Sequence, residues 1–202
     1  MSRNTGWAAA AAPAASAATA ACGSGCVSLY NLDYGSSYVV AAADGSSPFN
    51  GEFIDLQTAS DSNPAEDWYI DFEAPVIDLY EAGLVSEAVN QHYSNDEAYE
   101  FEYTPDGQES GLCLGTPSTA SNGLVLSLQP CGENADTLWI NDVADQYERN
   151  VPLINGSDTN FTYPYVLTSN TTSGYLTTTE LTGGDGVIDT GQYWSTEYGV
   201  LP

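Results

Sequence analysis

Side chains that could do chemistry are few in kind and strongly biased in charge. The chain has 202 residues, with 28 Asp plus Glu against only two basic side chains, Arg3 and Arg149, and a formal net charge of −26. The one histidine, His92, lies in a polar stretch and is expected at the surface, and the chain has four cysteines. Carboxylates are therefore the only abundant titratable groups, and no lysine is present to form a Schiff base.

The carboxylates do not form a recognisable catalytic or metal-binding set. Glu100 and Glu102 alternate with aromatic residues over 99–103, so they would share one strand face about 7 Å apart, with no partner across a cleft. Two acidic turns, 142–145 and 185–189, lack the alternating acidic pattern and the glycine of a calcium loop. Since no triad or opposed carboxylates can be assembled, we expect no enzyme, no metal and no cofactor.

The acidity also restricts the partners. Proteins bind nucleic acid and anionic membranes chiefly through Lys and Arg, so neither is expected as a partner. No stretch approaches the about 20 apolar residues that span a bilayer, so we expect no membrane insertion. Two readings of the charge remain open: a solvated shell that keeps the protein soluble, or a field that steers a basic partner.

The amino-terminal segment and the cysteines both bear on the compartment. Residues 8–21 contain eleven alanines in fourteen positions, so residues 1–21 are interpreted as an exported leader or a linker, and 22–202 as one domain. The four cysteines can pair in three ways, and closeness in sequence favours Cys22 with Cys26 and Cys113 with Cys131. Neither spacing is that of a zinc site, and disulfides persist outside a reducing cytosol. We therefore expect a secreted, extracellular protein.

Short strands dominate the expected secondary structure. Only residues 74–89 could carry a helical turn or two, while alternation at 99–103 and 124–128 is typical of strands. Turn dipeptides occur at Asp44-Gly45, Asn50-Gly51, Asp106-Gly107, Asn122-Gly123, Asn155-Gly156, Gly183-Gly184 and Asp185-Gly186. Many short strands with frequent turns predict an all-β sandwich or barrel.

A repeat built around tryptophan favours a closed threefold structure. Trp68, Trp139 and Trp194 each end a block that begins with an aliphatic strand and passes through a turn. From the second aliphatic residue of each block to its tryptophan the separations are 28, 25 and 27 residues, counted from Val40, Leu114 and Leu167. Three such units predict a threefold closed structure.

The middle block resembles a known family. Gly-Leu-Cys-Leu-Gly-Thr-Pro at 111–117, Leu-Gln-Pro-Cys at 128–131 and Thr-Leu-Trp-Ile at 137–140 resemble one unit of a ricin B-type β-trefoil, and Gln-Tyr-Trp at 192–194 matches its Gln-x-Trp motif. From about Tyr34 onward the chain is also similar to uncharacterised secreted actinobacterial proteins. The resemblance implies a six-stranded barrel with three hairpin caps and pseudo-threefold symmetry, in units of about 27–72, 73–142 and 143–202. It also implies neighbouring strands for Cys113 and Cys131.

The resemblance suggests sugar binding, but the sugar-binding pattern is incomplete. Such lectins carry an Asp after the Cys-Leu pair. Here that position is held by Ala41 in the first unit, Gly115 in the second and Thr168 in the third. The polar or aromatic residues that remain as candidate carbohydrate ligands are Ser127, Gln129, Asp136, Tyr175 and Gln192. The first hypothesis is a secreted, non-catalytic carbohydrate-binding protein. The alternative is a trefoil with degenerate sugar sites that serves as an interaction or structural subunit, with a secreted protein as its partner.

Overall fold

A computed structural model describes residues 26–35, 38–43, 47–60, 64–132, 134–145, 150–170, 174–182 and 189–198. The strands are β1 (Cys26–Asn31), β2 (Tyr38–Ala42), β3 (Ile54–Thr58), β4 (Trp68–Pro75), β5 (Glu97–Tyr103), β6 (Leu112–Gly115), β7 (Leu124–Val125), β8 (Ser127–Pro130), β9 (Leu138–Asn141), β10 (Leu153–Asn155), β11 (Tyr165–Thr168), β12 (Thr177–Glu180) and β13 (Trp194–Tyr198). Two short helices, α2 (Val76–Glu81) and α3 (Glu87–Tyr93), lie between β4 and β5. The segment 1–21 and the predicted Cys22–Cys26 pairing lie outside the described residues.

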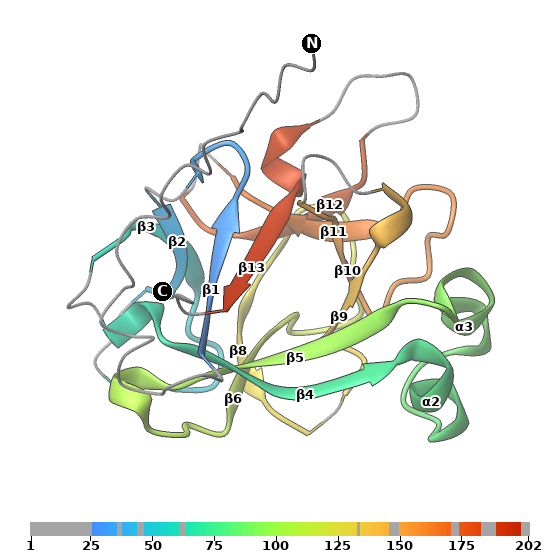
Figure 1. The fold of residues 1–202 in the computed structure, drawn as a ribbon, viewed down its shortest axis with the longest axis horizontal. Helices are drawn as coiled ribbons and strands as arrows, with labels where there is room; N and C mark the ends of the chain where they lie inside the picture. Colours follow the sequence, from blue (N-terminus) through green and yellow to red (C-terminus); the bar gives the residue numbers. More distant parts are fainter. Residues whose placement is uncertain are drawn as a thin grey trace, which may run out of the picture.

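Six of the strands form a closed barrel. Antiparallel pairing runs from β1 to β4, β5, β9 and β10 in turn, and β13 pairs with β1 on its other side. Just before β10, Val151 and Trp194 exchange backbone hydrogen bonds of 2.9 Å each, which joins the last strand to the fifth and closes the ring (Figure 1). Closure leaves these strands without an open edge inside the barrel wall.

Three hairpins, β2–β3, β6–β8 and β11–β12, cap one end of the barrel. Where they meet, the amide of Ile54 donates to the carbonyl of Leu126 (3.3 Å), Leu126 to Leu176 (3.0 Å) and Leu176 back to Ile54 (2.9 Å). All three side chains are fully buried. This ring of hydrogen bonds marks the pseudo-threefold axis, and it makes Ile54, Leu126 and Leu176 equivalent positions of the three units.

The tryptophans occupy equivalent positions, as the repeat predicts, and all three are buried in the core. The indole N–H groups of Trp68, Trp139 and Trp194 all donate to backbone carbonyls, at 2.8–2.9 Å. Their acceptors are the second aliphatic residues of the three blocks, Val40, Leu114 and Leu167. A buried indole thus keeps its one polar group satisfied, and the same bond is made three times.

The helices build a second apolar cluster outside the barrel. Val76, Leu79 and Val89 are buried against residues of β9, β10 and β11. Pro75 precedes α2, Gly83 with φ +77° follows it, and the Ser86 hydroxyl caps α3 by accepting from the Val89 amide at 3.1 Å. The helical content expected over 74–89 is confirmed, although α3 continues to Tyr93.

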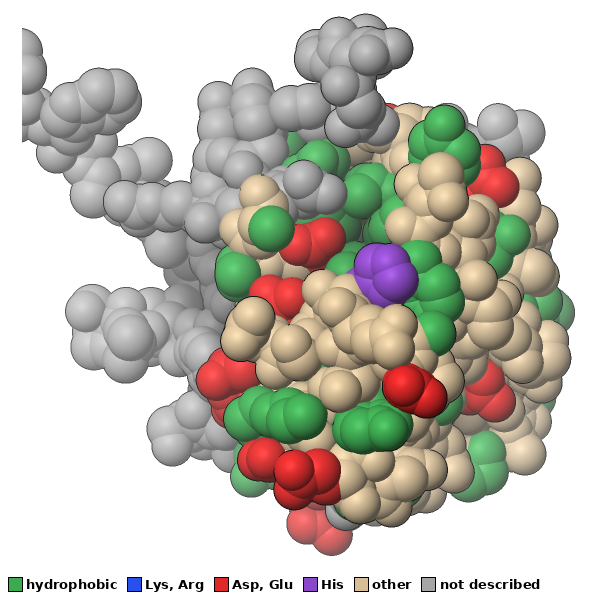
Figure 2. Space-filling model, turned by 90° about the vertical axis from the view of Figure 1, so that its right-hand side faces the viewer, with side chains coloured by type: hydrophobic (Ala, Val, Ile, Leu, Met, Phe, Trp, Pro, Cys, Tyr) green, Lys and Arg blue, Asp and Glu red, His purple; other side chains and the backbone are tan. Residues whose placement is uncertain are grey.

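His92 is exposed, as expected. On the face that Figure 2 presents, it lies among apolar side chains, and its ring stacks on Phe161 with centroids 4.4 Å apart. No helix in the described part of the chain is long and apolar enough to cross a membrane.

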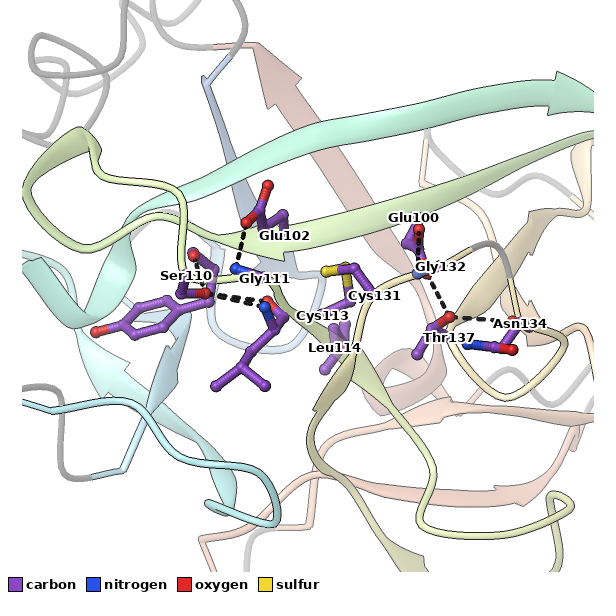
Figure 3. The surroundings of a disulfide bond; sticks show 12 residues. Glu100, Glu102, Ser110, Gly111, Cys113, Leu114, Cys131, Gly132, Asn134 and Thr137 are labelled. Atoms are coloured by element: carbon purple, nitrogen blue, oxygen red, sulfur yellow. Dashed lines mark hydrogen bonds between the residues drawn. A yellow bond between two sulfur atoms is a disulfide. The ribbon is translucent and has the colours of Figure 1, made fainter.

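A disulfide joins Cys113 to Cys131, as predicted. The Cα atoms are 5.1 Å apart, and Cys113 lies on β6 while Cys131 follows β8, the partner strand of the hairpin (Figure 3). The bridge therefore closes the ends of the hairpin in the second unit, which is the position that the Cys-Leu and Gln-Pro-Cys segments imply.

Candidate functional site

The hairpins present one row of outward side chains in each unit. Because strand residues alternate between faces, Phe53 and Asp55 beside Ile54 and Tyr175 beside Leu176 point away from the core, whereas Ser127 beside Leu126 is covered. Isolated bridges pair Phe53 with Ser127 and Asp55 with Tyr175, so rows from different units lie side by side. We call this region the cap surface and define it by Phe53, Asp55, Gln57, Ser127, Gln129 and Tyr175.

Two aromatic rings from different units meet on the cap surface. The rings of Phe53 and Tyr175 have centroids 5.1 Å apart and are tilted by 49°, and Phe53 is 49% exposed. A ligand that contacts this exposed phenylalanine removes apolar surface from water, which favours binding. The pair therefore offers a hydrophobic face for a ligand.

A carboxylate and an amide stand beside these rings. The Gln57 side-chain amide donates to Asp55 Oδ1 at 3.0 Å and to the carbonyl of Ala42 at 3.3 Å. Partial burial raises the pKa of Asp55, and the bond from Gln57 offsets part of that rise. The arrangement fixes a hydrogen-bond acceptor next to an apolar ring, which is the combination that a polyhydroxylated ring requires.

Solved structures of the same fold identify the architecture. The chain is similar to the designed threefold-symmetric protein ThreeFoil (TM-score 0.55, 14% identity, 85% of this chain and 97% of that chain). It is also similar to the β-trefoil lectin of the Vibrio vulnificus hemolysin/cytolysin, solved with N-acetyl-D-lactosamine bound (TM-score 0.50, 12% identity, 88% and 97%). The fold is a β-trefoil.

A third similar structure belongs to a much larger protein. A mosquitocidal holotoxin matches with a TM-score of 0.56 and 15% identity over 86% of this chain, which corresponds to 17% of that chain. No family model and no curated protein sequence matches. The likeness is therefore one of fold, and it supports the predicted β-trefoil.

In the second unit of the trefoil, the expected sugar position is closed. A Cβ atom added to Gly115 would lie 2.9 Å from Thr137 Cγ2 and 3.0 Å from the Asp136 carbonyl, so an aspartate cannot stand there without movement of the chain. Gln129 donates to the Ser127 hydroxyl at 2.7 Å, and Ser127 is only 2% exposed. Asp136 is half-buried at the edge of this region.

The other two units close the same position in different ways. Ala41 is fully buried, and the Thr168 hydroxyl bonds to the Val166 carbonyl at 3.0 Å and to the Thr179 hydroxyl at 2.7 Å. None of these three positions of the described trefoil therefore presents a carboxylate to a ligand.

The Gln192 side chain is buried in the third unit and holds its hairpin through hydrogen bonds. It is 1% exposed; its amide donates to the Thr179 hydroxyl (2.8 Å) and the Glu180 carbonyl (2.7 Å), and its oxygen accepts from the Thr182 amide (2.8 Å). In the first unit, Glu66 accepts from the Ser60 amide at 3.1 Å in the corresponding place. Gln192 thus fastens the outer strand of its hairpin, and a sugar could reach it only if residues 179–182 moved.

The carboxylates of β5 are structural as well. The alternation over 99–103 is confirmed, but the face that carries Glu100 and Glu102 is buried, with exposures of 1% and 4%. Glu102 accepts from the Gly111 amide at 2.6 Å, and Glu100 accepts from the Thr137 hydroxyl and the Gly132 amide, on either side of the disulfide (Figure 3). Within the described residues, no group of three or more His, Cys, Asp or Glu could hold a metal ion.

The structure therefore brings together Ser127, Gln129 and Tyr175 of the predicted ligands and places Asp136 beside them. Sequence reasoning missed Phe53 and Asp55. The signal was present: Phe53, just before β3, and Asp55 and Gln57 within it alternate with the same spacing as Ser127 and Gln129 along β8.

Proposed function

We propose that this protein is a secreted, non-catalytic carbohydrate-binding trefoil and that its ligand contacts the cap surface. The observation that supports this most is the pair of exposed Phe53 and half-buried Tyr175 beside Asp55. Sugars combine a C–H face, which packs on aromatic rings, with vicinal hydroxyls, which pair with a carboxylate or an amide. In this proposal Phe53 and Tyr175 stack on the sugar, and Asp55 and Gln57 bind its hydroxyls.

The remaining predicted residues take secondary parts. Ser127 and Gln129 border the aromatic pair from the second unit, and Asp136 contacts only a ligand that extends past Gln129. Gln192 acts by holding the third hairpin in place. The lectin of Vibrio vulnificus lends support by its fold and by its bound N-acetyl-D-lactosamine.

Geometry and charge narrow the class of glycan. Rings tilted by 49° do not form a flat platform, which disfavours adsorption to crystalline polysaccharide and favours soluble chains or chain ends. The net charge of −26 repels sulfated, sialylated and uronic glycans at moderate salt. The proposed ligands are neutral oligosaccharides.

A glycan array followed by calorimetry tests the proposal. Phe53→Ala should weaken binding by about tenfold, because it removes stacking and apolar burial. Tyr163→Ala is the matched control, since this exposed tyrosine (57%) lies outside the cap surface and should leave affinity unchanged. The proposal is wrong if no neutral glycan binds more tightly than about millimolar, or if both variants bind as the wild type does.

We propose secretion because the Cys113–Cys131 disulfide would not persist in a reducing cytosol. The alternative role, an interaction subunit with a secreted protein partner, has a feature of its own in its favour: the stretch of β4 beyond its pairing with β1.

A further inference from the structure

Strand β4 extends past its pairing with β1 and there has β5 as its one partner among the described strands, while residues 98–100 of β5 also pair with β9 on their other side. We call residues 70–75 of β4 and the facing residues of β5 the arm. The pairing of β4 with β5 continues as far as Pro75 opposite Glu97, whereas β1 pairs with β4 only at Trp68 and Tyr69 (Figure 1). On the side of β4 away from β5, no described strand pairs with residues 70–75. We call this side of β4 the open edge. An unpaired strand edge offers backbone N–H and C=O groups to any extended chain that approaches it.

A bulge in β4 brings Glu73 to the same face of the arm as Tyr99. The register shifts between Ile70 and Phe72, so that Glu73 faces Tyr99 across the strands. Beyond the bulge, Phe72 and Ala74 pack against the second apolar cluster, while Asp71 and Glu73 are exposed. Bulges re-aim side chains in this way, and here Glu73 comes to lie with Tyr99 and Glu97 beside the open edge.

The carboxylates of the arm have no basic neighbour in the described structure. Glu97 is exposed, lies next to Glu73 and accepts a 3.0 Å hydrogen bond from the Tyr99 hydroxyl. Burial raises the pKa of Glu73, and the adjacent Glu97 raises it further. Arg3 and Arg149 are the only basic side chains apart from His92, and both lie outside the described residues. On the face that Figure 2 presents, acidic side chains are visible among the described residues and no Lys or Arg is.

We infer that the open edge of β4 binds an extended, lysine- or arginine-rich segment of another protein as an added strand. The backbone of the segment completes the ladder of β4, and every second side chain faces Glu73 and Glu97, with its aliphatic stem on Tyr99. A second copy of this chain is excluded as the occupant, because it would place Asp71 and Glu73 opposite like charges. This inference does not depend on sugar binding.

The test uses the full chain and two synthetic peptides of about ten residues, the length of a long strand. One peptide alternates lysine with threonine, and the other replaces each threonine by proline. Both carry the same charge, but the proline peptide cannot supply a continuous ladder because proline has no N–H. The lysine–threonine peptide should bind at least about tenfold more tightly, lose affinity as salt increases, and protect backbone amides within residues 70–74 from hydrogen exchange.

Variants of the arm separate strand addition from general attraction. Glu73→Lys should weaken binding of the lysine–threonine peptide by about tenfold, and Glu73→Gln by less. Glu109→Lys, a charge reversal at an exposed residue between β5 and β6, should change affinity by less than about twofold. Equal affinity for both peptides, equal effects of the two reversals, or no protection of the amides of residues 70–74 at saturating peptide would each overturn the inference.

Discussion

Asp67 should make the stability of the protein fall as pH rises. Its carboxyl group is 2% exposed at the start of β4, and its Oδ1 has no hydrogen-bond partner among the described residues. Burial, followed by the neighbouring Asp106, raises the pKa of Asp67 to about 7 from an ordinary value of 3.8. The folded protein therefore keeps this proton up to about neutral pH, whereas the unfolded chain has already lost it in weak acid.

The sign and size follow from proton linkage. Between the two pKa values the native state binds more protons than the unfolded state, so the free energy of unfolding falls as pH rises through this window. From about pH 5 to pH 8 the loss from Asp67 is about 3 kcal/mol. Little further change from this group is expected above about pH 8, where both states are ionised.

Urea unfolding followed by fluorescence of the buried tryptophans measures this directly. Asp67→Asn removes the titration while keeping the shape of the side chain, so its stability difference between pH 5 and pH 8 should be about 3 kcal/mol smaller than in wild type. Asp78→Asn, at an exposed position of α2, is the control for the loss of one negative charge. If Asp67→Asn keeps the full pH dependence of the wild type, the assignment of this effect to Asp67 is wrong.

Three further outcomes are expected. Replacing Cys113 and Cys131 together by serine should lower the free energy of unfolding by about 3 kcal/mol, measured in urea without reductant, and leave glycan preference unchanged, because the bridge mainly restricts the unfolded chain. Gln192→Ala should cost about 1–3 kcal/mol, because the Thr182 amide and the Thr179 hydroxyl lose their partner; a loss of sugar affinity at full stability would instead make it a ligand. Gly115→Ala should destabilise by about 1–3 kcal/mol in thermal unfolding, since its Cβ would meet Thr137 and the Asp136 carbonyl.

The core could be predicted from the sequence because its pattern of aliphatic residues and tryptophan repeats in three units. A tryptophan whose indole must reach a backbone carbonyl one hairpin earlier keeps nearly the same separation in each unit, and that separation is visible without coordinates. The disulfide was predictable for the same reason, because its cysteines flank a single hairpin of the repeat.

The candidate site was harder to predict, because its residues come from different units. Phe53 and Tyr175 are more than a hundred positions apart and meet only because the hairpins converge on the axis. The burial of Glu100 and Glu102 was not predicted either. Alternation indicates which residues share a face of a strand, but not whether other segments cover that face. Gln192 matched a motif, but its side chain bonds to the hairpin of its own unit instead of facing solvent.

The ring of hydrogen bonds through Ile54, Leu126 and Leu176 has a consequence for how such a chain can change over time. Each unit gives its axial amide to the next and takes one from the previous, so no single unit, cut out alone, satisfies its own centre. Deleting or duplicating one unit would break the ring, whereas lengthening the connection between β4 and β5 does not touch it. The protein is thus free to acquire new parts at its periphery, such as the segment that carries α2 and α3, while the number of its units stays fixed at three.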